Sequence, residues 1–128
     1  MKKLFLTISI LLSVSSLKAQ TTGGTDFWLT FGINAYLTTE DVYLQIRIVN
    51  GNMDNDVSIT FTGLPATFTY HLLPQEVKTI DLLPGQKDAV YSATMGKSNK
   101  SVRITADLPV TAYAVNLCAN TTVVGNAG

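Results

Sequence analysis

Residues 42–49 read Val-Tyr-Leu-Gln-Ile-Arg-Ile-Val, with an apolar side chain at every even-numbered position. Successive side chains of a β-strand point to opposite faces, so this alternation predicts a strand with one buried face. The same period of two returns in residues 57–61, 68–72 and 102–106. Beyond residue 19, no stretch shows a convincing apolar period of 3.6, so the pattern predicts an all-β protein.

Turn-forming residues separate these alternating runs. Gly, Pro, Asn and Asp gather at 50–52, 63–65, 84–85, 96–99 and 107–109. We expect one antiparallel hairpin between 57–62 and 66–72, whose second strand ends before Pro74, and a break between strands at 107–109 that includes Pro109. Because half-buried strands need a second layer to cover their apolar faces, we predict an antiparallel β-sandwich of about seven to eight short strands.

The start of the chain has the pattern of an export signal. Lys2 and Lys3 precede an apolar run over residues 4–14, and small residues follow up to Ala19. The run is about 11 residues long, well short of the roughly 20 that span a bilayer, so we expect no transmembrane span. We therefore predict a cleaved signal peptide at 1–19 and a single domain at 20–128, secreted or at the cell surface. The leader resembles those common among Bacteroidetes.

Charge and cysteine content narrow the classes of partner. Removing residues 1–19 leaves six basic residues against nine acidic ones, a net charge of about −3. Nucleic acids and anionic membranes require clustered Lys and Arg, so we expect no nucleic-acid partner. Cys118 is the only cysteine, which excludes an intrachain disulfide. A buried small side chain is the favoured interpretation of Cys118, and a partner thiol elsewhere stays open.

Three motifs carry a resemblance to a known family. The segment after the leader is Gly24-Thr25-Asp26-Phe27-Trp28, followed by Phe31. This segment resembles the opening motif of the IgG Fc-binding protein N-terminal domain family. Residues 102–116 contain a strand, an acidic-x-Pro corner and a second strand with Tyr-Ala-x-Asn, and this succession is similar to a second hallmark of the family. The turn of the expected hairpin, at residues 63–65, also fits the family pattern.

The resemblance covers nearly the whole chain after the leader. It implies a secreted, extracellular recognition or adhesion module with the family's β-rich fold. Domains of that family are considerably longer, so the resemblance also implies the first part of a larger domain. The remainder of its own longer chain is then one expected partner.

One loop has the oxygen pattern of a calcium site. Asn50, Asn52, Asp54 and Asp56 place side-chain oxygens at every second position, as calcium loops do. An EF-hand loop in this register needs Gly at 55 and Glu at 61, where the chain has Asn55 and Phe61. A solvated turn is therefore the favoured interpretation and a weak calcium site the alternative. No other metal site and no cofactor is expected.

No arrangement of residues points to catalysis. His71 is the only histidine, and strand periodicity does not bring the nearest carboxylates in sequence, Glu76 and Asp81, together with any candidate serine. We therefore expect no enzymatic activity and a structural or surface role for His71.

Two groups of residues are candidates for recognition. Tyr43, Gln45 and Arg47 share the polar face of their strand and form the best candidate ligand-binding strip. Adjacent Phe27 and Trp28 must point to opposite faces, and we expect Trp28 to be a core or sheet-packing anchor rather than part of an exposed sugar- or protein-binding platform.

The sequence therefore predicts a non-catalytic recognition or adhesion module that binds an extracellular protein or glycan. An accessory domain of an extracellular enzyme, or a structural spacer in a surface protein, are the alternatives.

Overall fold

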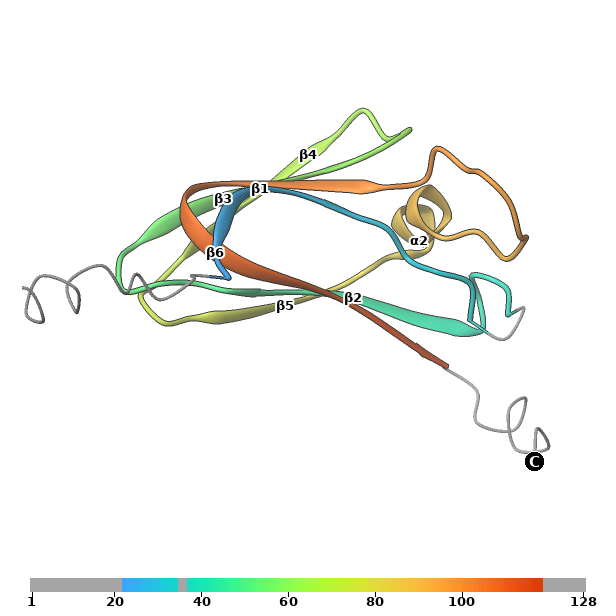
Figure 1. Ribbon diagram of the computed structural model, residues 1–128, viewed down its shortest axis with the longest axis horizontal. Coiled ribbons are helices and arrows are strands. Elements are labelled where there is room, and N and C mark those ends of the chain that lie inside the picture. The colour runs from blue at the N-terminus through green and yellow to red at the C-terminus, as the bar shows by residue number, and fades with distance from the viewer. Residues whose placement is uncertain (1–21, 35–36, 119–128) are drawn as a thin grey trace, which may run out of the picture.

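The computed structural model describes residues 22–34 and 37–118 (Figure 1). The predicted signal peptide at 1–19 lies outside the described residues. Six strands and one short helix make up the described chain, which confirms the all-β prediction. In chain order they are Gly24–Leu29 (β1), Val42–Val49 (β2), Asn55–Phe61 (β3), Thr67–Leu72 (β4), Val77–Asp81 (β5), Pro84–Val90 (α2) and Val102–Cys118 (β6).

The six described strands form one antiparallel sheet that curls on itself. The strand order is β4-β3-β6-β2-β5, and β1 also pairs with β6. Residues 102–106 of β6 pair with β3, residues 102–105 and 110 with β1, and residues 111–118 with β2. Figure 1 shows β6 leaving the layer of β1, β3 and β4 and entering the layer of β2 and β5. The two layers are therefore parts of one sheet, joined by a shared strand. The predicted sandwich of about seven to eight short strands is not confirmed, because the described residues form six strands in one sheet and β6 alone is 17 residues long.

The hairpin predicted around Gly63 is confirmed. Strands β3 and β4 pair antiparallel from Asn55 opposite Leu72 to Thr60 opposite Thr67. Gly63 has a φ of 87°, a conformation that L side chains rarely adopt, so glycine is needed at this turn.

The strand break predicted at Pro109 is wrong, because β6 runs without interruption through it. Residues 107–109 instead form a corner, in which none of the three has a cross-strand partner among the described strands. Proline lacks the N–H that a ladder requires, which suits Pro109 to this unpaired position.

A buried asparagine holds this corner in place. The Asn55 side chain donates from Nδ2 to the Leu108 carbonyl and accepts at Oδ1 from the Leu108 N–H, both at 2.9 Å. Asn55 Nδ2 also donates to Oδ1 of buried Asn50 at 3.1 Å. Asn50 Nδ2 in turn donates to the carbonyls of Met53 and Leu73, each at 2.8 Å. Side-chain amides thus satisfy backbone groups that the corner removes from the ladder.

Replacing Asn55 tests this arrangement. We expect Asn55→Ala to lower the free energy of unfolding by about 2–4 kcal/mol, because it leaves backbone groups of Leu108 without partners. Urea denaturation measures the change. Asn52→Ala is the matched control, since exposed Asn52 only accepts from Gln75, and it should change the value by less than about 0.5 kcal/mol. Equal midpoints for the two variants would contradict the role given to Asn55.

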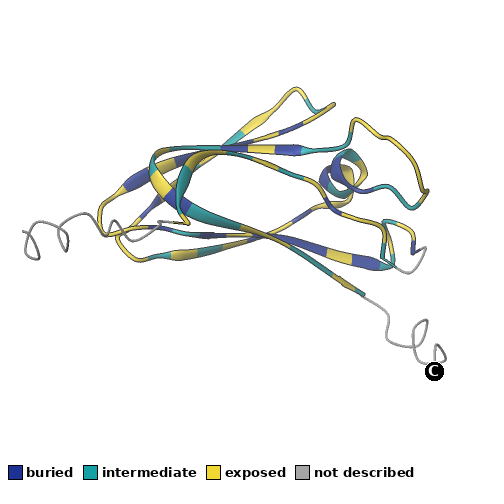
Figure 2. Ribbon diagram, in the orientation of Figure 1, coloured by how far each residue is buried: buried dark blue, intermediate teal, exposed yellow. Residues whose placement is uncertain are grey.

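The core lies between the two layers (Figure 2). The even-numbered side chains of β2 and the odd-numbered ones of β3 are almost fully buried, as their alternation predicts. They pack with Val102, Ile104 and Val110 of β6. Figure 1 shows α2 at one end of the space between the layers.

The interpretation of Pro84-Gly85 as a turn is wrong, because these residues begin α2. Proline is well tolerated in the first turn of a helix, where its missing N–H has no intrahelical partner. The Gln86 side chain accepts from the Leu83 N–H at 2.9 Å and so caps the helix start.

Trp28 is not a core anchor, contrary to the prediction. In β1 the inward positions are Phe27 and Leu29, which lie opposite Ile104 and Val102. Trp28 therefore points outward, opposite Arg103, and 64% of its surface is exposed. Strand alternation correctly places the two aromatic residues on opposite faces, but Phe27 and not Trp28 faces the core.

A pair of aromatic substitutions checks this placement. Trp28→Ala should lower the free energy of unfolding by less than about 1 kcal/mol, since little of the ring is buried. Phe61→Ala should lower it by about 3–5 kcal/mol, because Phe61 is buried and packs edge-on against Phe68 at 5.7 Å. Chemical denaturation of both variants measures the two free energies of unfolding. A larger decrease for Trp28→Ala than for Phe61→Ala would contradict the placement of Trp28 on the outer face.

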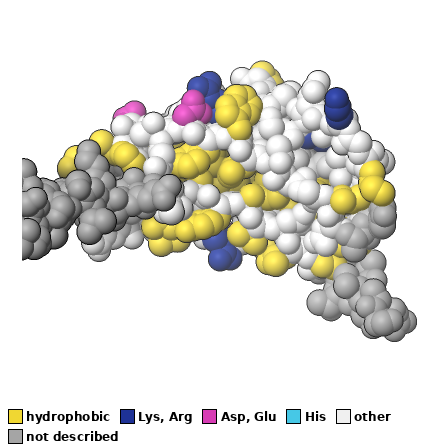
Figure 3. Space-filling model, in the orientation of Figure 1, with side chains coloured by type: hydrophobic (Ala, Val, Ile, Leu, Met, Phe, Trp, Pro, Cys, Tyr) yellow, Lys and Arg dark blue, Asp and Glu magenta, His cyan; other side chains and the backbone are white. Residues whose placement is uncertain are grey.

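One side of the molecule leaves apolar atoms visible between the layers. Figure 3 shows hydrophobic side chains along the middle of this side, with charged groups toward its upper and lower margins. Among the described residues, no helix has the length and apolar character needed to cross a membrane.

Candidate functional site

The candidate strip Tyr43, Gln45 and Arg47 lies on the outer face of the layer formed by β5, β2 and the second half of β6. Side chains directly opposite each other in paired strands share a face, so the register identifies their neighbours. Gln45 lies between Asp81 and Val115, Arg47 lies between Thr79 and Tyr113, and Tyr43 lies opposite Leu117. We call Tyr43, Gln45, Arg47, Asp81, Tyr113 and Leu117 the Tyr43 face.

Hydrogen bonds connect the polar residues of the Tyr43 face. Gln45 donates from Nε2 to Asp81 Oδ1 at 2.7 Å. Arg47 donates to Gln45 Oε1 from Nε at 3.2 Å and from Nη2 at 2.9 Å. Gln45 is only 8% exposed, so it is the buried centre of this network and not the solvent-exposed group that the alternation predicted.

The electrostatics of the Tyr43 face keep Asp81 ionised. Hydrogen bonds from Tyr43 and Gln45, with the nearby charge of Arg47, lower the pKa of Asp81. The hydrogen bond to Asp81 raises the pKa of Tyr43 in return. The carboxylate and the guanidinium are thus joined through one glutamine side chain, which fixes both charged groups relative to the sheet.

Exposed apolar side chains surround this polar centre. Tyr43, Tyr113 and Leu117 are all large, and each has roughly half of its surface exposed. The sequence pattern placed Tyr43, Gln45 and Arg47 on one face, and the structure adds Asp81, Tyr113 and Leu117. Only the strand register reveals these three neighbours, since they lie far from β2 in the sequence.

Three of the four proposed calcium-binding residues use a side-chain oxygen for another partner. Asn50 Oδ1 accepts from Asn55, Asn52 Oδ1 accepts from Gln75, and Asp56 Oδ1 contacts His71 at 2.7 Å. Across the described ranges 22–34 and 37–118, no three His, Cys, Asp or Glu side chains gather in a way that could hold a metal ion. Residues 51–54 are exposed, as the solvated-turn interpretation expects, whereas Asn50 and Asn55 are buried.

His71 is exposed and paired with Asp56 across the β3–β4 hairpin. The Nδ1–Oδ1 distance is 2.7 Å, and more than half of each side chain is exposed. The hydrogen bond to Asp56 raises the pKa of His71 above its ordinary 6.5, and the charges of Asp56, Asp54 and Glu76 act in the same direction. This arrangement is an exposed ion pair and provides no nucleophile.

The pH dependence of His71 tests this pair. Because His71 is the only histidine, its imidazole protons give an unambiguous NMR titration, whose pKa should lie above 6.5. The pair stabilises the fold below pH 6.5, and this contribution disappears as the pH rises through the raised pKa. Asp56→Asn should return the pKa toward 6.5. An unchanged pKa in that variant would contradict the assigned partner.

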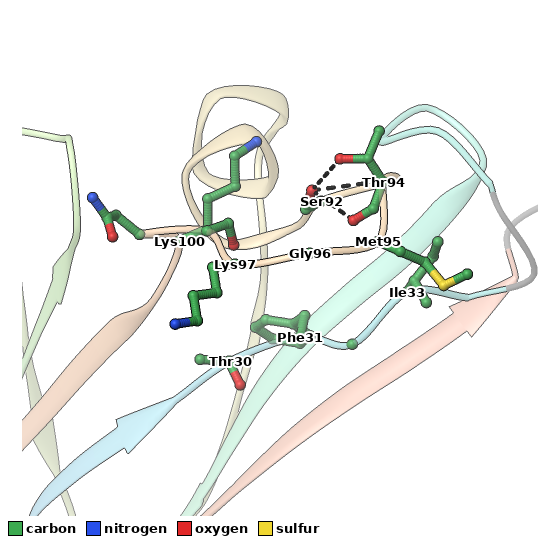
Figure 4. Close-up of a pocket in the computed structure, with 12 residues that line it drawn as sticks. Thr30, Phe31, Ile33, Ser92, Thr94, Met95, Gly96, Lys97 and Lys100 are labelled. Carbon is green, nitrogen blue, oxygen red and sulfur yellow. Dashed lines mark hydrogen bonds between the residues drawn. The ribbon is translucent and has the colours of Figure 1, made fainter.

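An open depression lies at the end of the molecule near α2 (Figure 4). Its volume is about 690 Å³, and residues 30–33, 92 and 94–100 line it. Lys100 donates to the Tyr91 carbonyl at 2.8 Å, while Figure 4 shows the Lys97 side chain reaching toward Thr30. Gly96-Lys97-Ser98 lies in this loop, where no helix follows, so it lacks the strand–loop–helix context of a phosphate-binding loop.

The Tyr-Ala-x-Asn segment contacts the chain that follows β1. Asn116 of the Tyr-Ala-x-Asn segment donates from Nδ2 to the Gly32 carbonyl at 2.7 Å. Its Oδ1 accepts from Asn34 Nδ2 at 3.2 Å. Asn116 thereby ties β6 to the chain that follows β1. Cys118 ends β6 opposite Val42, half-buried against the core.

The sequence matches no protein-family model, and comparisons with curated proteins and with solved structures found no significant match. The resemblance to the IgG Fc-binding protein N-terminal domain family therefore stays a prediction from the motifs.

Proposed function

We propose that this protein is a secreted or cell-surface, non-catalytic recognition module that binds an extracellular protein or glycan through the Tyr43 face. The observation that carries the proposal is the combination of a fixed polar centre with exposed aromatic side chains. Export to the outside rests on the predicted signal peptide at 1–19. The family resemblance supports the same class of function.

The composition of the Tyr43 face matches that of binding surfaces. Tyr, Trp and Arg are enriched among the residues that dominate interface energetics, and this face offers Tyr43, Tyr113 and Arg47 together. Tyrosine supplies a large, rigid contact area with a polar tip, which suits both protein and sugar ligands.

Pre-organisation further favours binding at this face. Arg47 is held by two hydrogen bonds to Gln45, which is itself held by Asp81. A partner that contacts Arg47 therefore meets a side chain whose rotamer is already restricted, and less entropy is lost on association. The guanidinium Nη1 group makes no contact in this network and is the donor we assign to the partner.

Binding assays against a defined panel test the proposal. Immobilised host glycoproteins, including immunoglobulin Fc and mucin, are exposed to the purified protein, and affinity is measured by surface plasmon resonance. For any panel member that binds, Tyr43→Ala and Arg47→Ala should each weaken the affinity about tenfold or more. Met53→Ala is the control, since exposed Met53 lies in the loop after β2, outside the Tyr43 face.

The outcomes separate cleanly. Tenfold losses in the two variants with an unchanged control support the proposal. Undiminished affinity in both variants would place recognition elsewhere on the molecule, and no binding to any panel member would count against a host glycoprotein as the partner.

A further inference from the structure

The layer opposite the Tyr43 face has a second outer surface of different chemistry. It crosses β1, the first half of β6, β3 and β4, and the register arranges its side chains in two rows. One row reads Trp28, Arg103, Thr60, Thr67, and the other reads Asp26, Thr105, Ser58, Thr69. We call these eight residues the Trp28 face, and we propose that it binds a neutral oligosaccharide. The inference is independent of the ligand assigned to the Tyr43 face.

A fixed aromatic ring provides the apolar part of the proposed site. The Arg103 guanidinium carbon lies 5.6 Å from the centroid of the Trp28 ring. Asp26 holds that guanidinium by two hydrogen bonds, from Nε to Oδ1 at 3.0 Å and from Nη2 to Oδ2 at 2.7 Å. Trp28 is still 64% exposed, so the ring is restrained on one side and open to a ligand. The apolar C–H face of a pyranose ring is suited to stack on such a surface.

Paired hydroxyl groups provide the polar part. The hydroxyl oxygens of Ser58 and Thr69 are 3.3 Å apart, and those of Thr60 and Thr67 are separated by the same distance. Only one of the two hydroxyl hydrogens in each pair is used within the pair. The other hydrogen and several lone pairs therefore remain for a ligand. Sugar hydroxyls both donate and accept, so they match a surface that offers both functions side by side.

The charge of the Trp28 face decides between classes of ligand. Asp26 and Arg103 compensate each other, which lowers the pKa of Asp26 and raises that of Arg103. The other six residues are uncharged, and the next outward pair on β3 and β4, Asp56 and His71, compensates itself, so neither a polyanion nor a polycation finds a complementary field. Stable protein–protein interfaces have an apolar centre, whereas Trp28 is the only large apolar side chain among the eight. An uncharged, hydroxyl-rich chain fits best.

The experiment uses the fluorescence of Trp28, which is the only tryptophan and therefore reports this face directly. The purified protein is titrated with cellohexaose, xylohexaose, mannohexaose, maltohexaose and hexa-N-acetylchitohexaose. We expect a saturable change in emission with at least one of them. Calorimetry with that sugar then compares variants, and Trp28→Ala should weaken binding at least about tenfold, which corresponds to about 1.4 kcal/mol.

Further variants separate recognition from folding. Thr60→Val removes one hydroxyl at nearly constant volume and should weaken binding several-fold while the urea midpoint stays close to that of the parent. Leu73→Ala is the control, since exposed Leu73 follows β4 and lies outside the Trp28 face. Its affinity for the sugar should be unchanged.

Three results would overturn the inference. The first is that no sugar of the panel causes a saturable change in the emission of Trp28. The second is a sugar affinity that Trp28→Ala and Thr60→Val leave intact. The third is a clear preference for an acidic chain such as hexagalacturonate. Tyr43→Ala and Arg47→Ala alter the other layer and test only the proposed function, whereas Trp28→Ala and Thr60→Val test only this inference. Failure of one proposal can therefore be told apart from failure of the other.

Discussion

The hydrogen bonds between Asn55 and the backbone of Leu108 are the constraint on which the architecture depends. They fix the corner at which β6 leaves one layer and enters the other. A strand that turns out of its ladder separates backbone donors and acceptors from their cross-strand partners, and at this half-buried corner a side chain replaces those partners. One asparagine side chain does so from the neighbouring strand β3, and Asn50 extends the same network to the loop after β2 and the end of β4.

The corner also explains why the molecule has two outer faces of different character. Each half of β6 contributes to one layer, and each layer buries one side of its strands against the shared core. The side chains left outside are Tyr, Arg and Asp around a buried glutamine on one layer, and Ser and Thr beside a Trp–Arg–Asp cluster on the other. Both faces lie on sheet and not on loops, so their side chains hold defined positions relative to one another.

Period-two alternation predicted the strands well where only one face is buried. It predicted β2 and the β3–β4 hairpin correctly, because each strand has apolar side chains on one face and is followed by a glycine turn or a polar loop. It failed at Pro109, because a proline that ends a strand and one that bends it look alike in sequence. The difference lies in the partner Asn55, which is 53 residues away from Leu108.

The remaining errors have the same origin in tertiary contacts. Nothing local distinguishes Phe27 from Trp28 as the inward residue, since the choice is made by the register of β1 on β6. Gln45 is polar and lies on the outward face, yet its neighbours cover it. For the candidate sites, the sequence supplied Tyr43, Gln45 and Arg47 but not the cross-strand groups that complete either face. Helix α2 was missed because seven residues are too few to show a helical period.

Strand β6 pairs in both layers, and this affects how the chain folds. Asp26 and Arg103, joined across β1 and β6, are 77 residues apart, and the three partners of β6 all precede it in the chain. Without residues 102–118 the pairing would reduce to two separate ladders, β3 with β4 and β2 with β5. Such two-stranded units are marginal in water. The core therefore depends on contacts that are distant in sequence, which favours slow folding.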